Sequence, residues 1–243
     1  MRRNNWGGTG RDCEPIRAVP LWASWLMPRR ARWWSGLLCL VWALVSLTSG
    51  AVLADSSGVR LYNNQCSSCH GPQGEGNVGA NAPALAGLDA PYLLRQLQHF
   101  RDGVRGAHPE DVIGAVMRGS VRALGDTSLR ELVEAIQRFP LPKPASIKVT
   151  GADLTAGRNY YNGICSACHG GKAEGIAALN APKLSGQHPD YLTRQFLHFR
   201  DKVRGGHPAD KFGLQMTKIT KALPEEKLIH DVSAYIAQLA ATP

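Results

Sequence analysis

Most of the chain consists of one sequence unit written twice, and this repeat constrains the fold more than any other feature. A Cys-x-x-Cys-His motif at residues 66–70 recurs at residues 165–169, a shift of 99 positions. The same shift aligns residues 92–109 with 191–208 at 13 of 18 positions, with no insertion or deletion. A fixed period marks a repeated structural unit. The sequence therefore predicts two tandem domains of one fold.

A proline-rich segment separates the two units. Residues 140–144 hold three prolines. Proline cannot continue a helix and favours extended chain, so this segment reads as a semi-rigid linker. We expect domain 1 at residues 55–139, the linker at 140–151 and domain 2 at 152–243.

The start of the chain resembles an export signal. A basic stretch at 29–32 precedes an apolar run at 36–47, and small side chains follow at 52–54. This order is typical of a secretory signal peptide. The apolar run is shorter than the roughly 20 residues that a membrane span needs. We expect a signal peptide at 1–54, with Met27 as a second candidate start; an uncleaved anchor is the alternative.

Removing this leader changes the charge argument. The whole chain has 243 residues and a formal net charge of +9, which favours nucleic acid or an anionic membrane as partner. The leader holds seven arginines and only two acidic residues, so residues 55–243 keep 21 basic and 17 acidic side chains. We therefore expect no nucleic-acid partner. Hydrophobic residues make up 44% of the chain, which excludes wholesale disorder.

Each unit has the periodicity of helices. Leu93, Leu97 and Phe100 have the spacing of one apolar helix face, and Pro91 suits the first turn of that helix. We expect helices at 92–100, at 152–161, after Asp126 and after Pro224. No segment alternates convincingly as a strand does. We therefore expect each unit to be small and all-α, with glycine-rich loops.

The Cys-x-x-Cys-His motifs hold the chemistry. Each places two thiols one helical turn apart, with an imidazole beside the second, which is the attachment signature of a c-type haem. The thiols form thioethers with the haem vinyl groups and the histidine binds iron. The candidate haem-attachment residues are Cys66, Cys69, Cys165 and Cys168, and the candidate iron ligands on this side are His70 and His169.

Three other kinds of site use such cysteines. A zinc site would have to join two motifs that are far apart in the sequence and belong to separate units. A disulfide is compatible with an exported protein, and a thioredoxin-like redox pair normally sits in an α/β context that is absent here. None of these explains the histidine that follows both motifs.

The methionines indicate the other iron ligand. Met117 and Met216 are the only methionines in the range 55–243, and each follows its motif histidine at the same interval. A thioether in the sixth position raises the potential of a haem. A methionine that merely fills the core is the alternative. The repeated histidines compete for the same position: His99, His198, His108 and His207.

Other repeated residues have candidate supporting roles. Pro83 and Pro182 also follow the motif histidines at a shared interval, and a backbone carbonyl there can accept the Nδ1–H and fix the ring. The alternative is an ordinary loop proline. Three repeated arginine pairs are candidates for haem propionates, against a solvated helix face as the alternative. They are Arg95 and Arg194, Arg101 and Arg200, and Arg105 and Arg204.

Together these residues resemble the di-haem cytochrome c4 family over essentially all of residues 55–243. The matching motifs include Ala-Pro-x-Leu-x-Gly at 82–87 and 181–186, and Tyr-Leu-x-x-Gln at 92–96 and 191–195. The resemblance implies two class I cytochrome c domains related by a pseudo-twofold axis, each around one covalently bound haem. It also implies His/Met ligation and a periplasmic electron carrier, often associated with the membrane and often feeding a terminal oxidase. One departure is Ala173 in place of Gly74, which puts the shape of that loop in doubt.

These observations favour an electron carrier over an enzyme. Iron with a ligand on both faces has no open position, so we expect redox protein partners and no small-molecule substrate. One alternative is a cytochrome subunit of a larger dehydrogenase, such as flavocytochrome c sulfide dehydrogenase; another is a di-haem peroxidase-like enzyme. Residues 55–143 have no net charge, whereas residues 144–243 have a net charge of +4. The second domain is therefore expected to face an acidic partner.

Overall fold

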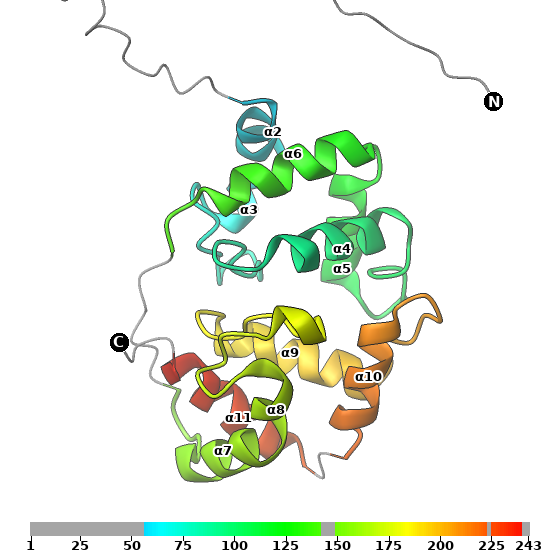
Figure 1. Ribbon diagram of the computed structural model, residues 1–243. Helices are drawn as coiled ribbons and strands as arrows, with labels where there is room; N and C mark the ends of the chain where they lie inside the picture. The colour runs from blue at the N-terminus through cyan, green and yellow to red at the C-terminus, as the bar shows by residue number, and fades with distance from the viewer. Residues whose placement is uncertain (1–55, 142–148, 223–224, 240–243) are drawn as a thin grey trace, which may run out of the picture. The chain divides into compact units, whose positions relative to one another are not determined.

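The computed structural model describes residues 56–141, 149–222 and 225–239, and the regular elements among them are helices joined by loops (Figure 1). Among them, the only strand-like pairings are two isolated antiparallel bridges, Asn77 with Ala82 and Ile176 with Ala181. The predicted all-α class is confirmed. The predicted signal peptide lies outside the described residues, as does most of the predicted linker. No helix in the described ranges is long and apolar enough to cross a membrane.

The two repeats form two sets of helices, here called half 1 (residues 56–141) and half 2 (residues 149–239) (Figure 1). Half 1 contains α2 (Ser57–Gln65), α3 (Ser67–His70), α4 (Ala90–Arg101), α5 (Val112–Val121) and α6 (Asp126–Gln137). Half 2 contains α7 (Leu154–Tyr160), the π-helix η2 (Tyr161–Cys165), α8 (Ser166–His169), the 3₁₀ helix η3 (Ala177–Leu179), α9 (Pro189–Arg200), α10 (Lys211–Thr220) and α11 (Glu226–Leu239). Both halves belong to one compact unit, residues 55–243.

Short polar side chains fix where the middle helices begin. The Asp89 carboxylate accepts a hydrogen bond from Tyr92 N at 3.0 Å, and Pro91 lies in the first turn of α4. His188 takes the place of Asp89 in half 2, where its Nδ1 accepts from Asp190 N at 3.3 Å. The sequence indicated no role for His188, but it caps α9. These caps satisfy backbone N–H groups that the first turn leaves free.

Each half has its own apolar core between its first and last long helices. In half 1, Tyr62 on α2 packs with residues of α4 and α6. In half 2, Tyr161 packs with residues of α9 and α11. A glycine permits the close crossing in both halves. A Cβ atom on Gly58 would overlap the carbonyl of Glu131, and one on Gly157 would overlap the carbonyl of Asp231.

The two halves contact each other reciprocally. On α4, Arg95 donates to the side chain and backbone oxygens of Asn180 at 3.1 and 3.2 Å. On α9, Arg194 donates to the same two atoms of Asn81 at 3.1 and 2.7 Å. Each residue of one half thus repeats the contact of its equivalent, as a twofold arrangement requires. Figure 1 shows α4 and α9 as the long helices at this junction.

One contact between the halves has no counterpart. The buried Gln187 donates to Ala84 O at 2.7 Å and accepts from Ala84 N at 3.1 Å. The equivalent position in half 1 is Leu88, a core residue. The symmetry is therefore a pseudo-twofold.

The loop in which the sequence departs from the family pattern keeps its shape. Gly74 has φ +70°, and Ala173 adopts φ +54° in the same left-handed region. The carbonyl of Gly74 accepts two backbone hydrogen bonds, at 2.7 and 3.0 Å, and that of Ala173 accepts the equivalent two at 2.8 and 3.0 Å. The alanine therefore preserves the loop despite a conformation that normally favours glycine.

Candidate functional site

Both Cys-x-x-Cys-His motifs lie at the end of a helix in the same local structure. In half 1, α2 ends at Gln65, Cys66 caps it, and α3 carries the rest of the motif to His70. Hydrogen bonds from Cys69 N and His70 N to Cys66 O, 3.2 and 2.9 Å long, wind this segment into a single turn. The turn places Cys66 half-buried, Cys69 exposed and His70 buried.

The ring of His70 is fixed on one side and faces a methionine on the other. Its Nδ1 lies 2.9 Å from Pro83 O, a distance at which Nδ1–H donates and Nε2 keeps its lone pair. Its Nε2 lies 3.4 Å from Met117 Sδ. Burial lowers the pKa of His70, which keeps the imidazole neutral. The carbonyl contact predicted from the shared interval is confirmed.

Half 2 repeats the contact of the motif histidine with a proline carbonyl. Nδ1 of His169 lies 2.8 Å from Pro182 O. Met216 lines the same cavity as His169, Cys165 and Cys168. Burial lowers the pKa of His169 as well. One difference is the π-helix η2, which replaces the last α-helical turn before Cys165 and leaves that cysteine buried.

Two buried tyrosines brace the motifs, a role that was not predicted from the sequence. The hydroxyl of Tyr62 donates to Gly71 O at 2.6 Å, and that of Tyr161 donates to Gly170 O at 2.6 Å. In half 1 this bond ties α2, and in half 2 it ties η2, to the residue that follows the motif histidine. The repetition of Tyr-Asn at 62–63 and 161–162 was the available signal.

The methionines lie on helices that the sequence analysis also did not predict. Met117 is on α5 and Met216 on α10. Asp111 begins α5 and accepts from Gly114 N at 2.8 Å, and Asp210 begins α10 and accepts from Gly213 N at 2.9 Å. The capped helices hold the methionines at fixed positions opposite the motifs.

The surroundings of the thiols do not resemble those of a zinc or redox site. All four described cysteines are free, so none forms a disulfide with another. Within the described ranges, no group of three or more His, Cys, Asp or Glu side chains comes together. Burial raises the pKa of Cys66 to about 11 and that of Cys165 to about 12. A raised pKa disfavours the free thiolate that disulfide exchange needs.

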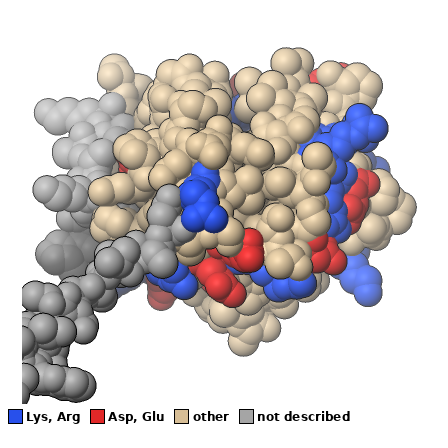
Figure 2. Space-filling view, turned by 90° about the horizontal axis from the view of Figure 1, so that it is seen from above, with Lys and Arg blue, Asp and Glu red and all other residues tan. Residues whose placement is uncertain are grey.

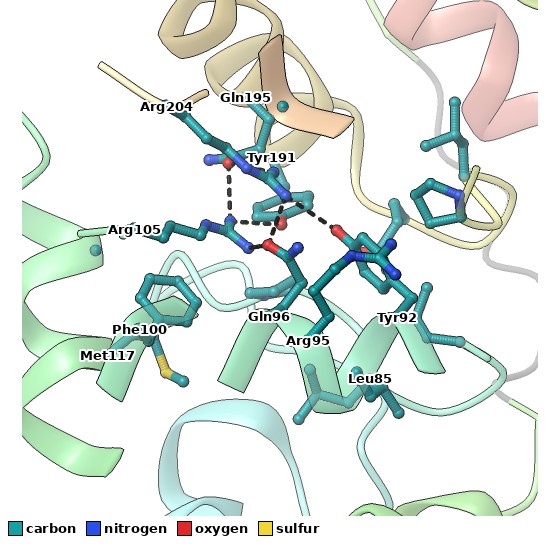
Figure 3. A pocket seen from close by; sticks show the side chains of 18 of the residues that line it. Leu85, Tyr92, Arg95, Gln96, Phe100, Arg105, Met117, Tyr191, Gln195 and Arg204 are labelled. Atoms are coloured by element: carbon teal, nitrogen blue, oxygen red, sulfur yellow. Dashed lines mark hydrogen bonds between the residues drawn. The ribbon is translucent and has the colours of Figure 1, made fainter. Parts of the chain in front are cut away.

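Between the halves, the cavity contains a cluster of polar side chains (Figure 3). Arg105 donates to Gln96 Oε1 at 2.7 Å and to Gln195 Oε1 at 2.9 Å. Arg204 donates to the same two oxygens at 2.9 and 2.8 Å. The hydroxyls of Tyr92 and Tyr191 accept from Arg204 and Arg105 at 3.1 and 3.4 Å. Neutral amides and phenols thus hold two buried guanidinium groups.

The hydrogen bonding of the arginines at this cavity shows whether the site suits a haem. Four arginines line the cavity together with both motifs, and each has a buried Nε that lacks a hydrogen-bond partner among the described residues: Arg95, Arg105, Arg194 and Arg204. Buried donors without acceptors are rare, and four at one cavity indicate an anionic group that would accept from them. The propionates of a haem are such groups. Paired thiols, neutral imidazoles and unsatisfied cations therefore all fit a c-type haem in each half.

The remaining repeated residues lie elsewhere. Arg101 pairs with Asp102 at 2.7 Å and with Asp126 at 2.5 Å, and Arg200 pairs with Asp201 at 2.9 Å. These two arginines are therefore engaged by carboxylates. His99 and His198 face aspartates of the opposite half, 3.8 Å away, and His108 and His207 accept hydrogen bonds from nearby backbone N–H groups.

Comparison with known proteins identifies the family of the chain. The family model for cytochrome c matches residues 56–134 and again 154–240. The chain is 31% identical over 182 residues to cytochrome c4 of Azotobacter vinelandii, covering 72% of this chain and 84% of that one. It is 30% identical over 182 residues to a thiosulfate dehydrogenase electron acceptor of Stutzerimonas stutzeri (strain A1501), with coverage of 72% and 78%.

Solved structures of cytochromes are similar to this chain as well. Reduced recombinant cytochrome c4 from Pseudomonas stutzeri matches with a TM-score of 0.60 at 28% identity, over 74% of this chain and 96% of that one. The two matched domains imply two covalently bound haem c groups. The chain therefore belongs to the cytochrome c family, as a di-haem electron-transfer protein of the cytochrome c4 type.

Proposed function

We propose that the protein is a periplasmic carrier of single electrons whose two haems each have one histidine and one methionine ligand. In half 1, Cys66 and Cys69 would attach the haem while His70 and Met117 bind iron. In half 2, Cys165, Cys168, His169 and Met216 take the same roles. The observation that carries this assignment is the 3.4 Å approach of Met117 Sδ to His70 Nε2, with Nδ1 already engaged by Pro83.

The residues around each haem site have distinct roles in electron transfer. Haem iron, when bound, supplies the one-electron redox chemistry. Pro83 O and Pro182 O orient the histidine rings and hold their protons on Nδ1. The methionine thioethers favour the reduced state and so raise the potential. A ligand on each face leaves no position for a substrate, which supports a carrier over a peroxidase-like enzyme.

Replacement of each methionine tests the ligand assignment. The oxidised protein is expected to show the long-wavelength absorption band of methionine bound to ferric haem. Met117→Ala and Met216→Ala should each remove about half of that band, because each variant affects one of two haems. Val116→Ala and Gln215→Ala, one residue earlier on the same helices, are the controls and should leave it intact. A full band in both methionine variants would contradict the assignment.

The relatives suggest a dehydrogenase as one source of electrons. The Stutzerimonas stutzeri relative and a second one from Thiomonas intermedia (strain K12) are named thiosulfate dehydrogenase electron acceptors. We therefore propose, as a second and more specific candidate, that this protein accepts electrons from a periplasmic dehydrogenase. Purification from the native cells tests it. A dehydrogenase that co-purifies and reduces both haems with its own substrate supports this role; reduction only through respiratory membranes supports the free carrier.

Surface charge favours an acidic partner for half 2. The exposed face of α10 carries Lys211, Gln215 and Lys218. The equivalent face of α5 carries Val112 and Val116, which are 68% and 61% exposed. Figure 2 shows one face of the molecule, on which acidic and basic side chains are interspersed and neither sign dominates. The methionine helices thus present a basic face in half 2 and an apolar one in half 1.

Ionic strength tests the docking of an acidic partner. Lys211→Gln with Lys218→Gln should slow oxidation by ferricyanide, an anionic acceptor, at low salt, and the difference should shrink as salt screens the charges. Val112→Gln, at the position equivalent to Lys211, is the matched control. Equal rates for the lysine variant and the parent at low salt would exclude this face. The proposal also includes Lys172 and Lys183 of half 2.

The periplasmic location rests on the leader. Its basic, apolar and small-residue segments are typical of an export signal. Fractionation with N-terminal sequencing tests it. A periplasmic protein that begins near residue 55 supports the proposal, whereas a membrane-bound protein that keeps the leader supports an anchor.

A further inference from the structure

Two histidines of the interface contact residues that belong to the opposite half. His99 on α4 has its Nδ1 3.8 Å from Asp210 Oδ1, in half 2. His198 on α9 has its Nδ1 3.8 Å from Asp111 Oδ1, in half 1. The two contacts are reciprocal, since the residues of each pair are related by the same shift that relates the two repeats. Each histidine therefore reaches across the junction in the same way.

The two aspartates are the residues that begin the methionine helices. Asp111 caps α5, which carries Met117, and Asp210 caps α10, which carries Met216. Their side chains are only 7% and 3% exposed. Each carboxylate also packs directly against a glycine of the helix that it caps, because a Cβ atom on Gly114 or Gly213 would overlap the capping carboxylate. Each carboxylate accepts a hydrogen bond from the N–H of that glycine, at 2.8 and 2.9 Å, so moving the carboxylate would strain or break the bond that holds the first turn of the helix.

Within the part of the chain that the structure describes, the histidine nitrogens that face these carboxylates have no other partner. Nδ1 of His99 and Nδ1 of His198 are both buried without a hydrogen bond. A buried polar atom without a hydrogen-bond partner destabilises the folded protein. A small closure of the gap between nitrogen and oxygen would let each Nδ1–H donate to the carboxylate opposite. The cap would then be held both by its own helix and by the other half.

From this geometry we infer that His198 is a positioning residue for the haem of half 1, and His99 a positioning residue for the haem of half 2. Each histidine fixes the aspartate that begins the opposite methionine helix, and thereby the position of the methionine at the iron. The inference rests on the proposed methionine ligation. It implies that the potential of each haem depends on a side chain of the other half.

Measured potentials test this crossed dependence in the holoprotein. Met117→His and Met216→His assign the two redox waves, because replacing methionine by histidine lowers the wave of the altered haem. His198→Leu should then lower the potential of the haem of half 1 and leave the potential of the haem of half 2 unchanged. His99→Leu should lower the potential of the haem of half 2 and leave that of half 1 unchanged. We expect a three- to tenfold change in the reduction equilibrium constant; tenfold corresponds to about 59 mV for one electron.

Conservative variants separate positioning from general damage. His198→Asn and His99→Asn keep a donor near the place of Nδ1 and should restore most of the shift. His230, a half-buried histidine on α11, provides the control. His230→Leu should not shift the potential of the haem in the opposite half. A shift confined to the haem of the mutated half, or no shift in either wave, would overturn the inference. Absence of the methionine band in the unaltered protein would instead refute the proposed ligation.

Discussion

At the residue scale, Ala173 shows how half 2 keeps a glycine loop without the glycine. Its φ of +54° is unfavourable for a side chain, yet its methyl group is fully buried in the core of half 2. Burial of a methyl group contributes about 0.8 kcal/mol, which offsets part of the left-handed penalty of about 1–2 kcal/mol. Half 1 provides no such space. A Cβ atom on Gly74 would lie 3.2 Å from both Ala86 N and Phe139 Cδ2.

We therefore predict that Gly74→Ala destabilises the protein by about 1–2 kcal/mol, from backbone strain with added crowding. Ala173→Gly, the matched change, should alter stability by less than about 1 kcal/mol, because relief of strain and loss of buried area oppose each other. Denaturant unfolding of the holoprotein measures both. Equal effects of the two variants would show that the loops are equally tolerant.

Residue spacing predicted some of these contacts and could not predict others. The interval from motif histidine to Pro83 or Pro182 was informative because the loop between them has a repeated length. The tyrosine braces were not predicted, since a hydroxyl that reaches a backbone carbonyl leaves no pattern besides its repetition. The capping role of His188 was not predicted, because the two repeats have different residues at this position. Asp89 caps its helix with a carboxylate oxygen, whereas His188 caps its helix with a ring nitrogen.

At the element scale, the close crossing of the first and last helices depends on one glycine in each half. We predict that Gly58→Ala destabilises the protein by about 2–3 kcal/mol, because its methyl group would overlap the α6 backbone. Gly119→Ala is the matched control. Gly119 lies within α5 with open space at its Cβ position, so alanine should stabilise by about 0.5–1 kcal/mol. Thermal unfolding should show opposite signs for the two variants.

The periodicity of α4 and α6 made them predictable, whereas α5 and α10 were not. Both methionine helices contain glycine at their third residue, and α5 has Val112 and Val116 on its exposed face. Exposed apolar residues and glycines obscure the amphipathic pattern on which such predictions rely. These helices are held by buried aspartate caps and by tertiary contacts.

At the scale of the whole molecule, the interface histidines link stability to pH. Burial is the main cause that lowers the pKa of His99; Arg95, Arg105 and Arg204 add to it and Asp210 opposes it. Burial likewise lowers the pKa of His198; Arg194, Arg105 and Arg204 add to it and Asp111 opposes it. The folded protein therefore keeps these rings neutral at pH values where the unfolded chain binds protons.

We predict that stability is full above the unfolded pKa of about 6.5 and falls as the pH drops below it, until the folded-state histidines also titrate. Replacing both histidines, as His99→Leu with His198→Leu, should flatten this part of the profile. Denaturant midpoints between pH 7.5 and 5 measure it, with His230→Leu as the control. An unchanged slope in the double variant would assign the acid sensitivity to other groups.

The haems should also be part of the core. A domain of about 90 residues buries little apolar surface of its own, and the cavity that both motifs line would be left open without the cofactor. We predict that the protein without haem, made with all four motif cysteines replaced by serine, loses most of its helicity near room temperature. Circular dichroism measures this. A cooperative melt close to that of the holoprotein would contradict it.

The reciprocal pairs of Arg95 with Asn180 and Arg194 with Asn81 have a consequence for the origin of the molecule. A surface whose halves recognise each other through equivalent residues is self-complementary, the property of a symmetric homodimer. A single-domain ancestor with this surface would have needed a second copy from solution. Joining two copies through residues 140–151 makes the encounter intramolecular, at an effective concentration that no longer depends on expression. In a single chain one half can carry Gln187 alone, whereas a symmetric homodimer would have to make this contact twice.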